Sequence, residues 1–291
     1  MSQILGSEYW ISQWQKAADG SRFHEVYPDE KQLWNRSAGA FDTGMGKSGV
    51  RETTFLKALR NIGFQASKKK RALDIGSGTG ALSVALAEKG ILVDALDNSE
   101  KMNQVLLEKC EAHQINTINI IAEDFNAFDS AEGTYDLVVG SLNPCLYNPN
   151  SFLKMLSLSK DAIVYIGITG GGNRPATEVP REKPLVELIT GISPGHNGSN
   201  HIIYPLNLLL SMGMNPTVSY VPSYWTREEE PEKAISRLIG QYGYFKDRYP
   251  DVENMIHDYV TRCTKDGVFV EHGAGTMGII ACRKQNTRKV K

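Results

Sequence analysis

The stretch that decides the fold runs from Ala72 to Gly80 and reads ALDIGSGTG. Its first four residues form a short, mostly apolar run that predicts a buried strand, and three glycines follow at every second position. Glycine permits a tight turn and lets a ligand approach the backbone closely. A helical pattern begins at Gly80 and would point its N-terminus at such a ligand. The stretch therefore predicts a strand, a ligand-binding turn and a helix.

On both sides of this stretch, short apolar runs alternate with helical patterns. We predict strands at residues 72–75, 91–96, 117–121, 135–140, 162–168, 217–221 and 276–282. Strands separated by helices imply right-handed crossovers and a parallel sheet. The predicted fold class is α/β, with a doubly wound, mostly parallel sheet of seven strands.

Three segments lie outside the predicted sheet. Residues 1–65 are rich in aromatic side chains and helical patterns, so we expect an N-terminal helical lid before a sheet domain at 66–291. Gly170-Gly171-Gly172 predicts a flexible break, after which an inserted cap is expected at about 174–215. Two polar helices are expected at about 231–265.

Composition excludes several classes of partner. The chain has 291 residues, 32 basic and 33 acidic side chains and a net charge of −1, whereas proteins that track a phosphate backbone usually carry a basic excess. No apolar run approaches the roughly 18 residues that span a bilayer. The four cysteines are scattered without a CxxC pair, which indicates reduced thiols and no zinc site. We expect a cytoplasmic protein without metal, nucleic-acid partner or membrane contact, and homodimerisation stays possible.

The residues that follow each strand carry the predicted site, because open α/β sheets bind ligands at the carboxyl ends of their strands. Asp97 ends the second strand about 20 residues after the glycines, where a carboxylate can accept both ribose hydroxyls. After the third strand come Glu123, Asp124 and Phe125, an acid pair and an aromatic that can meet an adenine. Ser141 follows the fourth strand, at the position that typically faces the reacting centre.

The glycine turn fits the binding pattern of two different cofactors. Gly76, Gly78 and Ala81 satisfy the G-x-G-x-x-A pattern of NAD-binding proteins. Asp74 instead favours S-adenosylmethionine, because it precedes the first glycine by two residues, where it can meet a cationic amino group. The Glu123-Asp124 pair and the helical segment before the turn point the same way. An NAD(P)-dependent oxidoreductase and a non-catalytic S-adenosylmethionine-binding protein remain the alternatives.

Four segments carry a resemblance to a known family: LDIGSGTG (73–80), ALDNS (95–99) followed by Met102, AEDF (122–125) and YDLVVGS (135–141). Through them residues 70–170 resemble the class I S-adenosylmethionine-dependent methyltransferases, in the small-molecule branch that includes ubiquinone- and menaquinone-biosynthesis-type enzymes. The resemblance implies a Rossmann-like fold, S-adenosylmethionine as cofactor, S-adenosylhomocysteine as product and a small-molecule methyl acceptor.

The resemblance also assigns roles to residues. Residues 76–80 would wrap the methionine moiety, Asp97 would bind the ribose, Asp124 the adenine amino group, and Asn98 with Met102 would flank the adenine. The predicted cofactor residues are Asp74, Gly76, Ser77, Gly78, Gly80, Asp97, Asn98, Met102, Glu123, Asp124, Phe125 and Ser141. Such enzymes often place a lid tyrosine near the cofactor carboxylate, and here Phe41-Asp42 stands in the corresponding place.

The sequence does not identify a catalytic side chain. Methyl transfer is an in-line displacement on an activated carbon, so alignment in a dry pocket can supply most of the acceleration. A general base is needed only if the acceptor loses its proton late. Candidates for the acceptor side of the pocket are His24, Tyr27, Asn143, His196 and His201. Glu271-His272 is expected to form a turn before the last strand.

Overall fold

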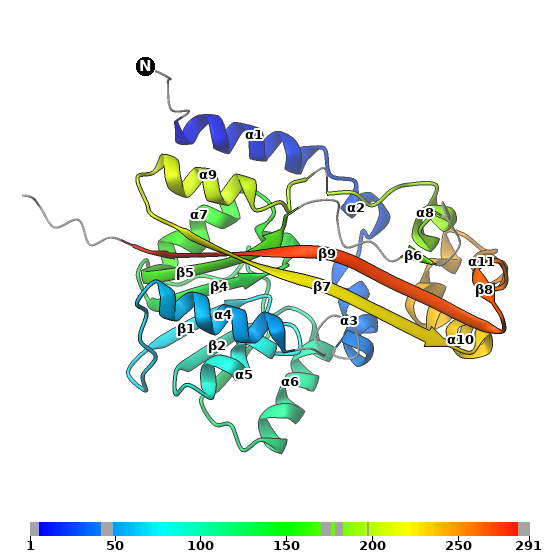
Figure 1. Cartoon of the computed structure of the whole chain (residues 1–291), viewed down its shortest axis with the longest axis horizontal. Coiled ribbons are helices and arrows are strands. Elements are labelled where there is room, and N and C mark those ends of the chain that lie inside the picture. The colour runs from blue at the N-terminus through cyan, green and yellow to red at the C-terminus, as the bar shows by residue number, and fades with distance from the viewer. Residues whose placement is uncertain (1–5, 42–48, 170–175, 178–182, 197, 285–291) are drawn as a thin grey trace, which may run out of the picture.

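The computed structural model describes residues 6–41, 49–169, 176–177, 183–196 and 198–284. The chain folds around one sheet with the strand order β3-β2-β1-β4-β5-β9-β7, to which two very short strands are added (Figure 1). The strands are β1 (Arg71–Ile75), β2 (Leu92–Leu96), β3 (Ile118–Ile121), β4 (Tyr135–Ser141), β5 (Ser159–Ile168), β6 (Ala176–Thr177), β7 (Thr217–Glu229), β8 (Thr264–Lys265) and β9 (Val268–Arg283).

Strands β1 to β5 are mutually parallel, and β9 returns antiparallel between β5 and β7. The predicted doubly wound, mostly parallel sheet with seven main strands is therefore confirmed. The break predicted at Gly170-Gly171-Gly172 lies outside the described residues.

Helices cover both faces of the sheet. They are α1 (Ser7–Asp19), α2 (Phe23–Val26), α3 (Glu30–Phe41), α4 (Val50–Asn61), α5 (Ala81–Ala87), α6 (Glu100–Ala112), α7 (Pro149–Leu158), α8 (Leu185–Thr190), α9 (Ile203–Ser211), α10 (Pro231–Tyr242) and α11 (Val252–Cys263), with 3-10 turns η1 (Pro144–Leu146) and η2 (Gly243–Asp247). Helices α1, α7 and α9 pack on one face, and α4, α5 and α6 pack on the other (Figure 1).

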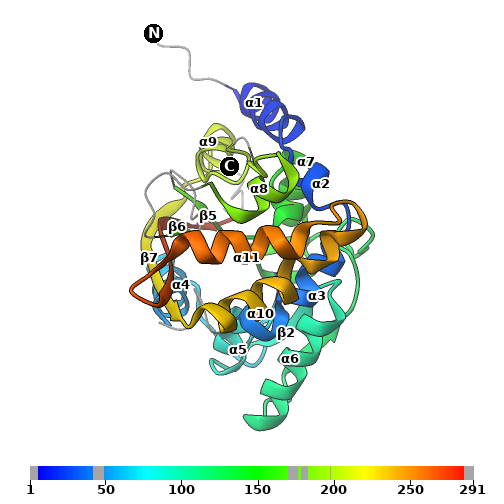
Figure 2. The same cartoon turned by 90° about the vertical axis from the view of Figure 1, so that its right-hand side faces the viewer.

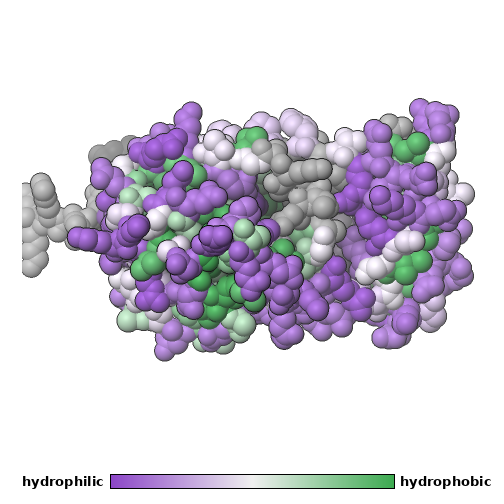
Figure 3. Space-filling view, turned by 90° about the horizontal axis from the view of Figure 1, so that it is seen from below, coloured by the Kyte–Doolittle hydropathy of each residue, from purple (hydrophilic) through white to green (hydrophobic). Residues whose placement is uncertain are grey.

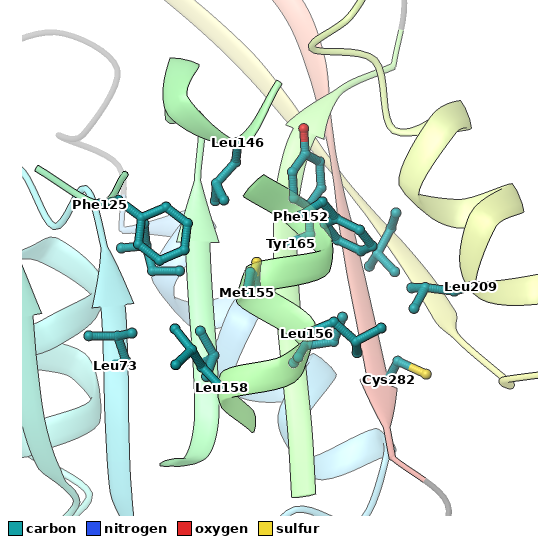
Figure 4. Close-up of a cluster of buried hydrophobic side chains, with 14 of the residues drawn as sticks. Leu73, Phe125, Leu146, Phe152, Met155, Leu156, Leu158, Tyr165, Leu209 and Cys282 are labelled. Atoms are coloured by element: carbon teal, nitrogen blue, oxygen red, sulfur yellow. The ribbon is translucent and has the colours of Figure 1, made fainter. Parts of the chain in front are cut away.

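The central parallel strands β1, β2, β4 and β5 are buried over most of their length, which explains why they appear in the sequence as nearly continuous apolar runs. In β1, Leu73 faces the layer of α7 while the neighbouring Ala72 faces the layer of α4 and α5. From α7, Phe152 and Met155 pack into the first of these layers together with Leu73 and Tyr165 (Figure 4). This rigid core fixes the positions of the turns at the carboxyl ends of the strands.

Strands β7 and β9 run much further than the sequence predicted. Within the sheet, β9 pairs with β5 only from Met277 to Arg283. Its preceding residues stay paired with the second half of β7, so the two strands leave the sheet as a ribbon that passes the carboxyl end of β5 (Figure 1). The predicted turn at Glu271-His272 was wrong, because both residues lie within this ribbon and pair with Arg227 and Thr226.

The end of the ribbon carries a helical cap, which we define as α2, α3, α8, α10, η2 and α11. These elements share a hydrophobic cluster of their own, separate from the clusters of the sheet. Figure 2 shows α10 and α11 side by side, with α3 next to α10. Seen from below, the cap end of the molecule presents mostly hydrophilic residues, as expected where apolar side chains turn inward (Figure 3).

The first 65 residues are distributed over three places. Helix α1 packs on α9, α3 belongs to the cap, and α4 packs against β7 and β9. The boundary between a lid and a sheet domain at residues 65 and 66 stays a prediction. In the described part of the chain, no helix is both long enough and apolar enough to cross a bilayer.

Candidate functional site

A cavity of about 720 Å³ lies between the carboxyl ends of the strands and the cap. One side is built by the turns after β1, β2, β3 and β4, and the other by α3, the start of α4, the ribbon and α10. Its volume falls in the range of about 300–1,000 Å³ that is typical of small-molecule sites.

The glycine turn after β1 forms the floor of the cavity. Gly76 and Gly78 have φ values of +63° and +55°, which L-residues rarely adopt, and a Cβ on Gly76 would overlap the side chain of Asn143. The amides of Gly76 and Ser77 both donate to the carbonyl of Leu96, at 2.8 and 3.1 Å. These hydrogen bonds fix the conformation of the turn, and its residues 76–79 border the cavity.

Gly80 lies at the start of α5, just outside the cavity wall. It precedes α5 with φ of +82°, and a Cβ there would overlap the side chain of Leu106 on α6. Gly80 does not border the cavity, although the sequence predicted it among the cofactor residues. Glycine is needed here because α6 packs closely against the turn.

Asp97, at the end of β2, is tied to the same turn. Its Oδ2 accepts the amide of Gly78 at 2.8 Å, and its Oδ1 accepts the amide of Ser99 at 2.8 Å. Burial raises the pKa of Asp97, and these two N–H donors oppose that shift. Each carboxylate oxygen keeps a further lone pair, and the side chain borders the cavity.

Asp74 lies beneath the turn with only 2% of its surface exposed. Its Oδ2 accepts the hydroxyl of Ser83 at 2.7 Å. Burial raises the pKa of this carboxyl to about 6, while Ser83 and Arg51 lower it. Asp74 borders the cavity, so a cation bound there would find a carboxylate that is ready to ionise.

The turns after β2 and β3 form a second part of the cavity wall. Asn98 donates through Nδ2 to Oδ2 of Asp124 at 3.2 Å, and Glu123 borders the cavity next to it. Met102 and Phe125 are 2% and 4% exposed and also border the cavity. The wall thus combines flat apolar surface with carboxylates, which is the chemistry that a purine with an exocyclic amine needs.

Two hydroxyl oxygens in the wall are buried without a hydrogen-bond partner among the described residues. They are Oγ of Ser77, in the glycine turn, and Oγ of Ser141, at the end of β4. A buried hydroxyl without a partner costs free energy unless a ligand supplies one. Both residues border the cavity, which supports a polar ligand at this end of the sheet.

Of the five candidates for the acceptor side, only Asn143 borders the cavity. His24 contacts Glu30, a residue of the cavity wall, at 2.7 Å. Tyr27 is buried in the cap and packs against the rings of Phe23 and Phe245.

The two remaining histidines also lie outside the cavity wall. His196 lies between the rings of Phe23 and Tyr147, and burial lowers its pKa to about 4. His201 accepts the amide of Ile203. Both side chains are therefore held by contacts within the fold, and neither borders the cavity.

The sequence did not predict the residues on the cap side of the cavity wall. Its polar members are Glu30, Arg36, Ser37, Arg51, Arg227, Arg237, Gln241, Tyr242 and Glu271, and Trp34 with Phe41 adds apolar surface. No spacing in the sequence joins them, because the ribbon and α3 bring together residues more than 200 positions apart. Phe41 reaches the cavity, whereas the adjoining Asp42 lies outside the described residues.

Residues 72–161 match the family model described as a methyltransferase domain. A Geobacillus sp. protein named as a methyltransferase is 42% identical over 79 residues, covering 25% of this chain and 31% of that protein. The ribosomal protein L11 methyltransferase of Helicobacter pylori is 28% identical over 153 residues, covering 49% of this chain and 45% of that protein. The chain thus spans less than half the length of these relatives.

A solved structure titled as a methyltransferase from Bacillus halodurans is 13% identical, with a TM-score of 0.47, and covers 80% of this chain and 99% of that chain. The domain match covers β1 to the start of β5 and so includes every turn that forms the sheet side of the cavity. By this match, residues 72–161 form a methyltransferase domain.

Proposed function

We propose that this protein transfers a methyl group from S-adenosylmethionine to a small-molecule acceptor held between the glycine turn and the cap. The observation that carries the proposal is the two-sided cavity, with cofactor-type chemistry at the strand ends and a separate wall supplied by the cap. A cap above the strand ends leaves a bounded space rather than an open surface, which favours an acceptor of small size.

The residues present fit the cofactor. The backbone of Gly76 and Gly78 has room beside the methionine moiety, and Asp97 has lone pairs free for the ribose hydroxyls. Asp124 accepts the adenine amino group, while Met102 and Phe125 supply the apolar contact surface. The unpartnered hydroxyls of Ser77 and Ser141 add two donors for the cofactor's polar groups.

When bound, the cofactor supplies a methyl group that is already activated for displacement. The chain's own contribution is to orient the two reactants and to exclude water. The turn after β1, fixed by its hydrogen bonds to Leu96 and Asp97, sets the position of the donor. The cap residues set the position of the acceptor across the cavity, and Ser141 and Asn143 border the space at the end of β4.

Methyl transfer to a protein is the competing acceptor class, because the relatives include ribosomal protein L11 methyltransferases. The test is to incubate the protein with methyl-labelled S-adenosylmethionine and a bacterial lysate split by size into metabolites and macromolecules. We expect label only in the metabolite fraction, and none with the Gly78→Val variant. Label confined to macromolecules would exclude a small acceptor, and no label in either fraction would favour a non-catalytic binding protein.

Cofactor binding should depend on the protonation of Asp74. A cationic amino group next to this carboxylate favours its ionised form, so binding lowers a pKa that stands at about 6 in the free protein. The affinity for S-adenosylhomocysteine should therefore rise as the pH increases from 5 to 7 and then level off. Calorimetric titration at several pH values, in buffers of different ionisation enthalpy, measures both the affinity and the proton released.

The control for this prediction is Asp74→Asn, which removes the titrating group and keeps a partner for Ser83. Because the folded-state pKa lies above the ordinary value of 3.8, ionisation of Asp74 destabilises the free fold as the pH rises through about 6. The variant should therefore lose the pH dependence of binding and, above pH 6, melt no lower than the parent. An unchanged pH slope in Asp74→Asn would exclude this role.

A further inference from the structure

Among the described residues of the cavity wall, the strand-end side carries carboxylates, whereas the cap side carries arginines together with Glu30 and Glu271. Four carboxylates follow the strands, namely Asp74, Asp97, Glu123 and Asp124. The basic residues of the wall are all arginines, and they come from α3, α4, β7 and α10: Arg36, Arg51, Arg227 and Arg237. The carboxylates at the strand ends suit the cationic cofactor, but the four guanidinium groups on the cap side outnumber the two carboxylates there and need a different explanation.

Two of these arginines are neutralised within the protein. Arg51 donates through Nε and Nη2 to Glu52 at 3.0 and 2.9 Å. Arg237 bridges two carboxylates, with Nε 2.8 Å from Glu229 and Nη2 2.6 Å from Glu271. All three side chains of this bridge are at least four-fifths buried, so Arg237 is fixed and not available to a ligand as a free charge.

Arg227 lies directly opposite Glu271 in the ribbon, where the two would be expected to pair. Arg237 binds the Oε2 atom of Glu271 instead, and Arg227 forms no ion pair with any residue that the structure describes. Arg36 likewise contacts no described carboxylate, and its guanidinium lies over the ring of Tyr244 at 5.0 Å. Both unpaired groups border the cavity.

The ribbon holds Arg227 away from the glycine turn. The last residue of β7 that pairs beside the end of β5 is Val221, opposite Met277, and Arg227 follows six positions later. At about 3.3 Å per strand residue, Arg227 stands roughly 20 Å further along the ribbon. It therefore belongs to the cap wall of the cavity and faces the space left for the acceptor.

We infer that the methyl acceptor carries an anionic oxygen group, a carboxylate or a phosphate, and that Arg227 and Arg36 bind it. This inference rests on the proposed function, because it names the class of substrate for the same cavity. Guanidinium groups bind such oxyanions through paired N–H donors. Arg227 is half-buried without a described counter-charge, which is costly until a ligand supplies one, and Arg36 is an exposed guanidinium at the same cavity. The anion anchors the acceptor, while another atom of the acceptor receives the methyl group.

The same wall indicates an apolar body for this acceptor. Trp34 and Phe41 meet edge to face, with ring centroids 6.5 Å apart, and both border the cavity beside Arg36. Aromatic surface next to unpaired guanidinium groups favours a molecule with a flat apolar part and a charged end. Small aromatic acids are therefore suitable probes.

The experiment titrates three matched probes into the protein saturated with S-adenosylhomocysteine: 3-phenylpropionate, phenyl phosphate and the neutral 3-phenylpropionamide. We expect both anions to bind, the amide to bind at least tenfold more weakly, and added salt to weaken the anions alone. The tighter of the two anions identifies the preferred oxyanion. Arg227→Gln and Arg36→Gln should each weaken anion binding about tenfold or more, as the loss of a charged hydrogen bond predicts.

Arg60→Gln is the matched control, because Arg60 is an exposed residue of α4 outside the cavity wall. It should leave anion binding unchanged, while Arg227→Lys should restore part of the affinity lost in Arg227→Gln. Thermal melting of each variant confirms that it is folded. Equal binding of the amide, no anion binding at millimolar concentration, or an unaffected Arg227→Gln would each overturn the inference.

Affinity for S-adenosylhomocysteine separates this inference from the proposed function. We expect Arg227→Gln to bind it within about twofold of the parent, and a larger loss would assign the arginine to the cofactor instead. A parent protein that fails to bind S-adenosylhomocysteine, yet binds the anions through Arg227, would leave the anion site standing and remove the methyltransferase proposal.

Discussion

Gly78→Val is expected to abolish measurable binding of S-adenosylhomocysteine, with a loss in affinity of more than about a hundredfold. Gly78 borders the cavity, and the nearest atom to an added Cβ is Cε1 of Phe41 at 4.0 Å. The new side chain therefore has space within the protein but occupies the volume proposed for the methionine moiety. Calorimetric titration measures the affinity, and thermal melting measures the cost to the fold.

The matched control is Gly213→Val, after α9. Gly213 has φ of +76°, nothing lies within 4 Å of its added Cβ, and it does not border the cavity. Both variants place valine in a left-handed conformation, which costs about 1–2 kcal/mol, so both should melt at lower temperature. Only Gly78→Val should lose the cofactor. Normal binding by Gly78→Val would remove the glycine turn from the cofactor site.

Asp97→Ala is expected to weaken S-adenosylhomocysteine binding by about 1–3 kcal/mol, or roughly 5- to 150-fold. The substitution removes an acceptor for the ribose hydroxyls, and it also frees the amide of Gly78 that Asp97 holds at 2.8 Å. Because the substitution removes both interactions, we expect its loss of affinity to be the second largest, after that of Gly78→Val. Titration of the parent and the variant under the same conditions gives the difference.

Asp129→Ala controls for the loss of an acidic side chain, because Asp129 is exposed and lies outside the cavity wall. It should bind the ligand as the parent does. If Asp97→Ala also binds normally, the carboxylate at the end of β2 does not contact the ribose.

The central parallel strands could be predicted because they are buried on both faces and appear as apolar runs. Leu137, Val138 and Val139 of β4, for example, are fully buried, and no amphipathic helix produces such a run. The glycine turn was equally legible, since Gly76 and Gly78 adopt conformations that favour glycine. Burial of a strand and a positive φ at a turn each restrict the residue type locally, so both can be predicted from the sequence.

The ribbon was underestimated because its outer half is not apolar. Arg227 and Glu229 on β7 and Glu271 on β9 interrupt the pattern that marks a strand. Glu229 and Glu271 are explained by their ion pairs with Arg237 of α10, and Arg227 borders the cavity. The cap wall depends on this ribbon, so its arginines could not be joined to the glycine turn in advance. Tyr27 and His196 were predicted as candidates for the acceptor side of the pocket, but their rings pack within aromatic clusters.

The central claim is that the cavity binds S-adenosylmethionine through the turn after β1. Calorimetric titration of the unmodified protein, first with S-adenosylhomocysteine and then with NADH, tests it most directly. We predict one site with a dissociation constant in the micromolar range for S-adenosylhomocysteine, and no heat of binding for NADH. Binding of NADH with no response to S-adenosylhomocysteine would contradict the claim.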